Sequence, residues 1–209
     1  MRYIHRMNLQ TDPVGFHIIG TTYGFWLPNE ERGSGSDFVR ADHLTKFGPA
    51  NPVATRRSVA YRPFDREVRR LACESLRYPY VEFNGRQARA VGRGFANELL
   101  NFGGTMYACS ILENHFHGVT GAHRYDIRRF VGRLKGAATK QLRAEGIHPI
   151  ADYPLPDGSL PSPWARLPWV VYLWTEEDML RAIRYVEENP LKQRKPKQQW
   201  SFVVPYAPR

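Results

Sequence analysis

The stretch TMYACSILENHFHGVTG, residues 105–121, decides the fold of this chain. Two β-prone runs, 105–112 and 115–121, flank the polar pair Glu113-Asn114, a pattern typical of an antiparallel hairpin. Outward from this hairpin, hydrophobic periodicity predicts two further strands and four helices. The strands are expected at 14–23 and 169–174, and the helices at 64–78, 86–101, 124–144 and 176–189. Strands and helices interleave, which predicts an α+β fold: a single domain with an antiparallel sheet and helices packed on it.

The charge of the chain favours a polyanionic partner. Its 209 residues include 30 Lys and Arg against 20 Asp and Glu, a net charge of +10, and such a field attracts nucleic acid or another polyanion. Two cysteines are too few for a disulfide framework or a cysteine-rich zinc site. The sequence has no apolar run of membrane-spanning length and no signal peptide, so we expect no membrane partner and a cytoplasmic location.

The length suits one domain, which we expect to cover residues 1–209. Three segments inside it lack a helix or strand pattern. They are an irregular loop at about 24–60, a connector at about 146–168 that holds six prolines, and a basic C-terminal tail from about 191. The tail begins after Pro190, where we expect the last helix to have ended at Asn189. We expect the tail to be solvated, with an accessory contact to nucleic acid as the open alternative.

The helix expected at 124–144 is strongly basic, with seven Lys and Arg against one Asp. Its apolar stripe includes Ile127, Phe130 and Leu134 at helical spacing. On the opposite side a basic stripe collects four residues, which are Arg129, Arg133, Lys140 and Arg143. A solvated helix face normally mixes both signs of charge. The near absence of acids therefore indicates a face that meets phosphates, with a merely solvated face as the alternative.

The second half of the hairpin carries two histidines with one residue between them. Successive side chains of a strand point to opposite faces, so His115 and His117 share one face while Phe116 points into the core. Two imidazoles in this arrangement can hold one divalent cation with a third ligand from elsewhere. The alternative is a pair of ordinary surface histidines. His17, in the first strand, could face the same site, but we expect it to be a core histidine.

The last helix places a tyrosine in polar company. Thr175 is its expected N-cap, and three acids follow in the first turn, where the helix dipole favours them. Arg181, Tyr185 and Asn189 follow one another at a spacing of four residues and so lie on one stripe. Such a stripe suits a nucleophile held beside a phosphate and a metal. The alternative is a packing tyrosine whose hydroxyl reaches the surface.

Together these segments resemble the single-tyrosine HUH nucleases, and more narrowly the REP-associated tyrosine transposases. The HUH motif, two histidines flanking a hydrophobic residue, is matched by His115-Phe116-His117, and the family's tyrosine helix is matched by YVEENP at 185–190. Three more runs match in the family's order: TTYGFWLP at 21–28, LKGAAT at 134–139 and PWAR at 163–166. The resemblance covers about residues 15–206 and implies the ferredoxin-like fold of HUH nucleases.

The resemblance also implies an activity, namely the cleavage of single-stranded or hairpin DNA by transesterification. A Mg²⁺ or Mn²⁺ ion would be held by His115, His117 and Asn189, with Glu188 as the alternative third ligand. Tyr185 would attack the phosphate and form a 5′-phosphotyrosine. Arg181, or the metal, would help the tyrosine hydroxyl to ionise. The residues expected to contact nucleic acid are Arg129, Arg133, Lys135, Lys140 and Arg181.

The same resemblance implies a monomer or homodimer associated with the nucleoid in the bacterial cytoplasm. Unpaired bases can stack on exposed indole rings, and four tryptophans are candidates, although each also suits a core. They are Trp26, Trp164, Trp169 and Trp200. One alternative function is that of a catalytically inactive protein of the same fold that binds structured DNA or RNA. Another is a nuclease that hydrolyses its substrate and releases it.

Overall fold

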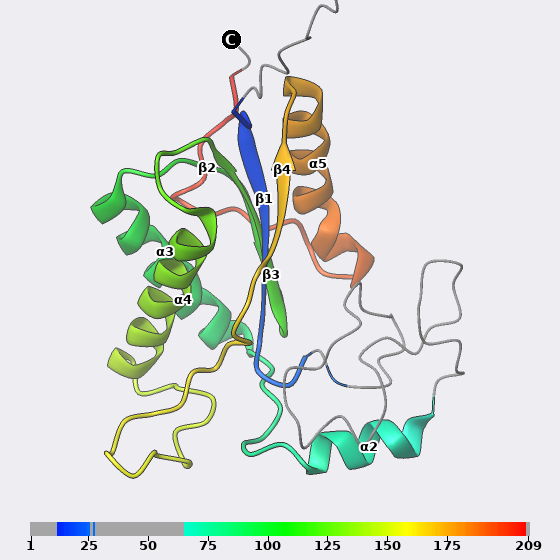
Figure 1. The fold of residues 1–209 in the computed structure, drawn as a ribbon, viewed down its shortest axis with the longest axis vertical. Coiled ribbons are helices and arrows are strands. Elements are labelled where there is room, and N and C mark those ends of the chain that lie inside the picture. The colour runs from blue at the N-terminus through cyan, green and yellow to red at the C-terminus, as the bar shows by residue number, and fades with distance from the viewer. Residues whose placement is uncertain (1–11, 26, 28–64, 208–209) are drawn as a thin grey trace, which may run out of the picture.

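The computed structural model describes residues 12–25, 27 and 65–207. Its centre is a four-stranded antiparallel sheet in the order β2-β3-β1-β4 (Figure 1). The strands are β1 (Gly15–Thr21), β2 (Met106–Ile111), β3 (His115–Gly121) and β4 (Trp169–Leu173). The predicted hairpin is confirmed, because β2 and β3 pair directly in antiparallel register. The α+β fold with helices packed on an antiparallel sheet is confirmed as well. Trp26 and most of the loop expected at 24–60 lie outside the described residues.

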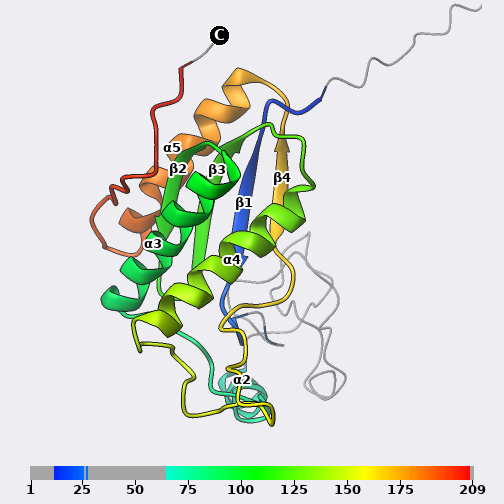
Figure 2. The same ribbon diagram turned by 90° about the vertical axis from the view of Figure 1, so that its left-hand side faces the viewer.

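Four helices accompany the sheet: α2 (Arg66–Glu74), α3 (Gly85–Phe102), α4 (Ile127–Ala144) and α5 (Glu176–Lys192). Helices α3 and α4 cover one face of the sheet, and α5 covers part of the other (Figures 1 and 2). Each begins at a residue whose side chain accepts hydrogen bonds from the first turn, and these N-caps are Asp65, Asn84, Asp126 and Thr175. In the described part of the chain, no helix is long and apolar enough to cross a membrane.

The main core lies between the sheet and the α3–α4 layer. Phe116 of β3 is fully buried there and meets Phe95 of α3 edge to face, at 4.8 Å between ring centroids. The two helices approach each other closely because α3 carries glycine at the crossing. A Cβ built on Gly94 would lie 2.6 Å from the Cα of Ala138 in α4, so a larger residue there would force the backbones apart.

The last helix runs past its predicted end. Helix α5 continues through Pro190 to Lys192, whereas we expected it to end at Asn189. Proline lacks a backbone N–H and disfavours the helical conformation of the residue before it. At this position the loss falls in the last turn, where the Pro190 carbonyl accepts hydrogen bonds from Gln193 and Lys195. The local proline rule is therefore outweighed by packing, since Asn189 and Pro190 are both buried.

The segment after α5 is also different from the solvated tail that we expected. Its side chains return to the sheet and to α3, where Trp200, Phe202 and Val203 pack against the main core. The Gln198 side chain bonds both the N–H and the carbonyl of Ile111 at the edge of β2, at 2.7 and 2.8 Å. The apolar content of residues 200–204 explains the packing, and the basic residues before them masked this signal.

Candidate active site

Strand β3 brings its two histidines to the face of the sheet that α5 covers. His115 and His117 are buried, while Phe116 between them points into the opposite core, as the alternation predicted. Their rings lie 5.0 Å apart between centroids. The sheet therefore presents two imidazoles side by side beneath the C-terminal half of α5.

Hydrogen bonds at the Nδ1 atoms orient both imidazoles. The Nδ1 of His115 lies 2.8 Å from the Asn114 Oδ1, an oxygen that can only accept, so this nitrogen is the donor of the hydrogen bond. The Nδ1 of His117 lies 2.9 Å from the Nε2 of His17. This is the arrangement in which a histidine bonded through one nitrogen offers the other to a metal. His17 is therefore part of the site, not the core histidine that we expected.

Burial keeps the imidazoles of His17 and His117 uncharged. Loss of solvent lowers the pKa of His17 to about 4. Loss of solvent, with smaller contributions from His115, His17 and Lys192, lowers the pKa of His117 to about 2. Neutral imidazole is the form that can coordinate a metal. The two rings are therefore ready to act as ligand and hydrogen-bond partner across the whole neutral range.

Helix α5 lays Tyr185 and Asn189 over the histidines. The Asn189 side chain is buried, and its Nδ2 lies 3.5 Å from the Nε2 of His115. The ring of Tyr185 lies 5.6 Å from that of His117 and 5.7 Å from that of His17. Tyr185 stays 42% exposed, so part of the residue is open to a substrate. Glu188 is exposed on another side of the helix, which leaves Asn189 as the residue beside His115.

Lys192, a residue that we did not assign to the site, lies over the ring of Tyr185. Its Nζ lies 3.8 Å from the centroid of the Tyr185 ring. The signal was present in the sequence, because Lys192 follows Tyr185 by seven residues and so lies on the same helix stripe. The expected cation, Arg181, pairs instead with Glu177 and Asp178 at 3.1 and 3.5 Å.

The donor set at this site suits a metal only if the amide takes part. The described residues contain no group of three His, Cys, Asp or Glu side chains that could hold a metal ion. His115 and His117 supply two nitrogens, and the amide of Asn189 could supply an oxygen if it turned by 180°, since the two ends of an amide differ only in donor and acceptor. Two imidazoles and one amide oxygen form an open, neutral ligand set that would leave room for a phosphate oxygen.

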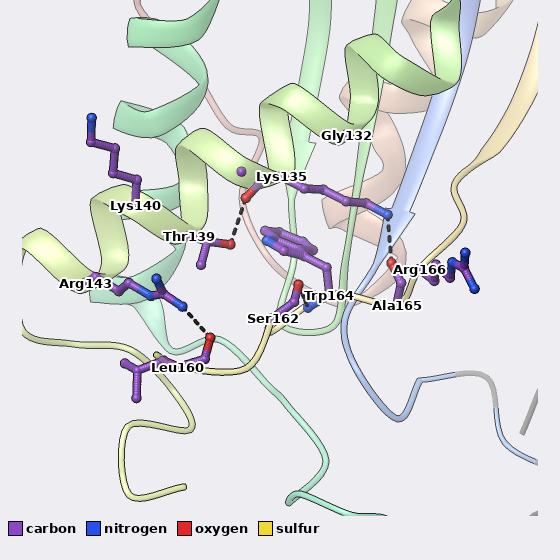
Figure 3. A pocket seen from close by; sticks show the side chains of 11 residues that line it. Gly132, Lys135, Thr139, Lys140, Arg143, Leu160, Ser162, Trp164, Ala165 and Arg166 are labelled. Atoms are coloured by element: carbon purple, nitrogen blue, oxygen red, sulfur yellow. Dashed lines mark hydrogen bonds between the residues drawn. The ribbon is translucent and has the colours of Figure 1, made fainter. Parts of the chain in front are cut away.

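The basic residues predicted to bind nucleic acid lie at different places in the structure and do not form one surface. Arg133 pairs with Glu98 of α3 and lies over the Phe102 ring, so it faces the neighbouring helix. Arg129 is exposed near the start of α4. Lys140 lines a groove beside α4, while Lys135 is buried at the same groove and donates to the Ala165 carbonyl at 2.9 Å (Figure 3).

The tryptophans divide in the same way. Trp164 is buried and meets Phe83 and Phe116 edge to face. Trp200 packs over Gly92 of α3, where a Cβ would lie 2.2 Å from its ring. Trp169 is 56% exposed. It pairs with Ile19, which in turn pairs with His117, so Trp169 lies on the face of the sheet that carries the histidines.

No protein-family model and no curated protein matches this chain. Among solved structures, the chain is similar to a REP-associated tyrosine transposase bound to a REP hairpin. That match has a TM-score of 0.45 and 11% sequence identity, and it covers 92% of this chain and 74% of the other. At this identity the match gives no information about individual side chains of the site.

Proposed function

We propose that this chain is a metal-dependent enzyme that cuts and rejoins single-stranded DNA, as a transposase does, through a covalent tyrosine intermediate. The observation that carries the proposal is the meeting of Tyr185 and Asn189 of α5 with His115 and His117 of β3, although Tyr185 follows His115 by 70 residues in the sequence. A tyrosine beside a pair of oriented imidazoles is poorly explained by packing alone. The pattern of motifs that resembles the HUH transposases points to the same chemistry.

In the proposed reaction the Tyr185 oxygen attacks a phosphorus atom of the DNA strand. The bond from phosphorus to the 3′ oxygen breaks, the 3′ oxygen gains a proton, and the tyrosine proton leaves to solvent. The products are a 5′-phosphotyrosine and a free 3′-hydroxyl. Because one phosphoester replaces another, the energy of the bond is kept and the reverse reaction can join strands.

His115, His117 and Asn189 would hold a Mg²⁺ or Mn²⁺ ion. When bound, such an ion supplies charge that offsets the negative charge developing on the scissile phosphate. His17 and Asn114 would act as positioning residues. They bond the Nδ1 atoms of His117 and His115, which would leave the Nε2 atom of each ring to face the metal ion.

Lys192 would assist the nucleophile. An ammonium over a tyrosine ring favours the build-up of negative charge on that ring system, and it also attracts a phosphate. Lys192 is already 3.8 Å from the ring centroid and needs no rearrangement to act. Arg181 is the weaker candidate, since its guanidinium is held by two carboxylates.

Trp169 would receive an unpaired base next to the cleavage site. It lies two strands from His117 in the same row of the sheet, about 10 Å away at ordinary strand spacing. Its ring is exposed, and base stacking on an exposed aromatic ring is tolerant of sequence. The strand would therefore pass from Tyr185 across β1 to β4.

The proposal is tested by incubating the protein with an end-labelled hairpin oligonucleotide that has single-stranded flanks, with Mg²⁺, with Mn²⁺ or with a chelator. A labelled band that resists denaturation and requires the metal is expected. The double variant His115→Ala/His117→Ala should form no such band and should bind Mn²⁺ more weakly by calorimetry. Cleavage without an adduct would mean hydrolysis. Tight DNA binding with neither cleavage nor adduct would mean an inactive binding protein.

A further inference from the structure

A groove of about 640 Å³ opens between α4 and the connector segment 160–166 (Figure 3). Helix α4 covers the face of the sheet opposite to α5, the helix that carries Tyr185 (Figures 1 and 2). Helix α4 forms one wall, and the connector forms the other. Four cations line the groove, namely Lys135, Lys140, Arg143 and Arg166, and none of its lining residues is acidic. A cleft lined by charges of one sign concentrates ligands of the opposite sign.

Two buried donors at this groove have fewer partners than they can bond. Trp164 is 4% exposed, and its indole Nε1 has no hydrogen-bond partner within the described part of the chain. The indole lies under α4 between Lys135 and Thr139 (Figure 3). Lys135 is 7% exposed, and the Ala165 carbonyl is the one acceptor that the described residues offer its ammonium, which has three hydrogens to donate. Unpaired buried donors are costly, so an acceptor that entered the groove would be bound favourably.

Burial alone lowers the pKa of Lys135 to about 8. Carboxylates usually accompany a buried lysine, but the described residues pair none with this one. An anion in the groove would restore the stability of the charged form. The direction of this shift agrees with the unpaired donors, and both favour an anionic ligand.

The helix wall is shaped to admit a bulky ligand. Gly132 and Gly136 lie one turn apart on the groove side of α4, and a Cβ built on either meets nothing within 4 Å. Glycine inside a helix is less favourable than alanine. Packing inside the protein does not require these two glycines, in contrast with Gly94, and they leave the groove side of α4 open to a ligand.

The groove and the candidate active site lie at the same end of the sheet. Trp164 forms a bridge with Thr22, and the Ala165 N–H donates to the carbonyl of Thr21, which is paired with His115 in the sheet. Between the two sites stands Phe116, whose ring meets that of Trp164 at 5.6 Å. A strand that leaves Tyr185 therefore needs only to turn around the end of the sheet to reach the groove.

We propose that this groove is a second DNA site, which holds the phosphate backbone and one unpaired nucleotide of the strand that Tyr185 cuts. Phosphate oxygens would lie on Lys135 and Lys140, and an acceptor of the nucleotide would take the indole N–H of Trp164. The proposal rests on the proposed function for the identity of the ligand. The groove would hold the DNA strand on the other side of the sheet from the catalytic site and would not contact the reacting atoms.

The experiment uses the full chain with Tyr185→Phe, which keeps the DNA intact, and a hairpin oligonucleotide with single-stranded flanks. Gly136→Leu fills the groove from a position where an added Cβ meets nothing within 4 Å, so folding should be preserved. It should weaken DNA binding by about tenfold or more, the contribution of roughly one stacked or bonded nucleotide. Lys140→Ala should flatten the slope of log K against log salt by about 0.7, the value for one phosphate of a single strand. Arg128→Ala, which removes the same charge from the same helix outside the groove, should leave the slope unchanged.

A second readout follows the groove itself. The chain has five tryptophans, and the indole N–H resonance of Trp164 can be identified as the one missing from Trp164→Phe. Addition of the hairpin should shift this resonance in the protein with an open groove and should not shift it with Gly136→Leu. Inorganic phosphate alone should shift it less at equal phosphate concentration, whereas an equal shift would mean a site for free phosphate.

The outcomes separate this proposal from the proposed function. If the groove variants bind DNA normally and the Trp164 resonance does not move, the groove proposal is overturned, whatever Tyr185 does. If the groove variants lose DNA while the chain with Tyr185 intact forms no adduct at saturating DNA, the groove proposal stands and the catalytic proposal fails. An unmodified chain that binds no hairpin DNA overturns both.

Discussion

Replacing Trp169 by alanine should weaken the binding of single-stranded DNA and leave folding intact. The ring is 56% exposed on β4, so its removal costs little packing. It lies on the same face as His115 and His117, two strands from His117, where an unpaired base next to the scissile phosphate would rest. Stacking of one base on an aromatic side chain is worth about 1–3 kcal/mol, which corresponds to a loss of affinity of about 5- to 150-fold.

The same strand region offers a matched control. Trp174 is 47% exposed and stacks on Tyr172, whose ring contacts Phe16 on the opposite face of the sheet. Trp174→Ala removes the same side chain at similar exposure, and we expect it to change DNA affinity less than twofold. Trp169→Phe should keep a substantial part of the affinity because a ring remains.

The assay is fluorescence anisotropy of a labelled oligonucleotide at several salt concentrations, in the Tyr185→Phe background. Stacking releases no counterions, so Trp169→Ala should lower affinity at every salt concentration with an unchanged salt slope. Circular dichroism of each variant checks the fold. Equal losses from Trp169→Ala and Trp174→Ala, or no loss from Trp169→Ala, would refute the path of the strand across β1 to β4.

Three further predictions concern packing and the site. Gly94→Ala should destabilise the fold by about 1–3 kcal/mol, because its Cβ meets the backbone of α4, whereas Gly136→Ala should stabilise the fold by about 0.5–1 kcal/mol. Thermal unfolding compares the two variants, and equal changes in stability would contradict the close α3–α4 contact. Lys192→Met should slow adduct formation at saturating DNA by about 3- to 30-fold, because the cation over the Tyr185 ring is lost. Single-turnover kinetics measure this rate, with Lys197→Met as the control. Equal rates for both variants would mean that Lys192 is not part of the site. His17→Ala should lower the Mn²⁺ affinity by about 10- to 100-fold, the usual effect of losing a residue that orients a metal ligand. Calorimetry measures the affinity, and His17→Gln should restore part of it. Unchanged affinity in His17→Ala would mean that His17 does not orient His117.

The parts of the site that follow local periodicity were predictable from the sequence. Strand alternation placed His115 and His117 on one face and Phe116 in the core, and the structure agrees. Helical spacing placed Tyr185 and Asn189 on one stripe of α5. In both cases the inference needs only the geometry of one element, so distant parts of the chain cannot change it.

The parts that depend on tertiary partners were not predictable. His17 reaches His117 only because β1 pairs with β3 in one particular register, and no local pattern of the first strand reveals that register. The side chain of Arg133 pairs with Glu98 on a different helix, so it does not form an open basic stripe with the other three residues. Lys135 became buried because the proline-rich connector folds over α4 and offers the Ala165 carbonyl.

The central claim, that Tyr185 is the nucleophile, is tested most directly by locating the DNA on the protein. The protein is allowed to react with hairpin DNA and Mn²⁺, the adduct is digested with protease and nuclease, and the modified peptide is sequenced by mass spectrometry. The account predicts a nucleotide on Tyr185, its loss in Tyr185→Phe, and its persistence in Tyr172→Phe, a control at a tyrosine that is 50% exposed. A nucleotide on Tyr172 or another tyrosine, or an adduct that survives Tyr185→Phe, would contradict the account.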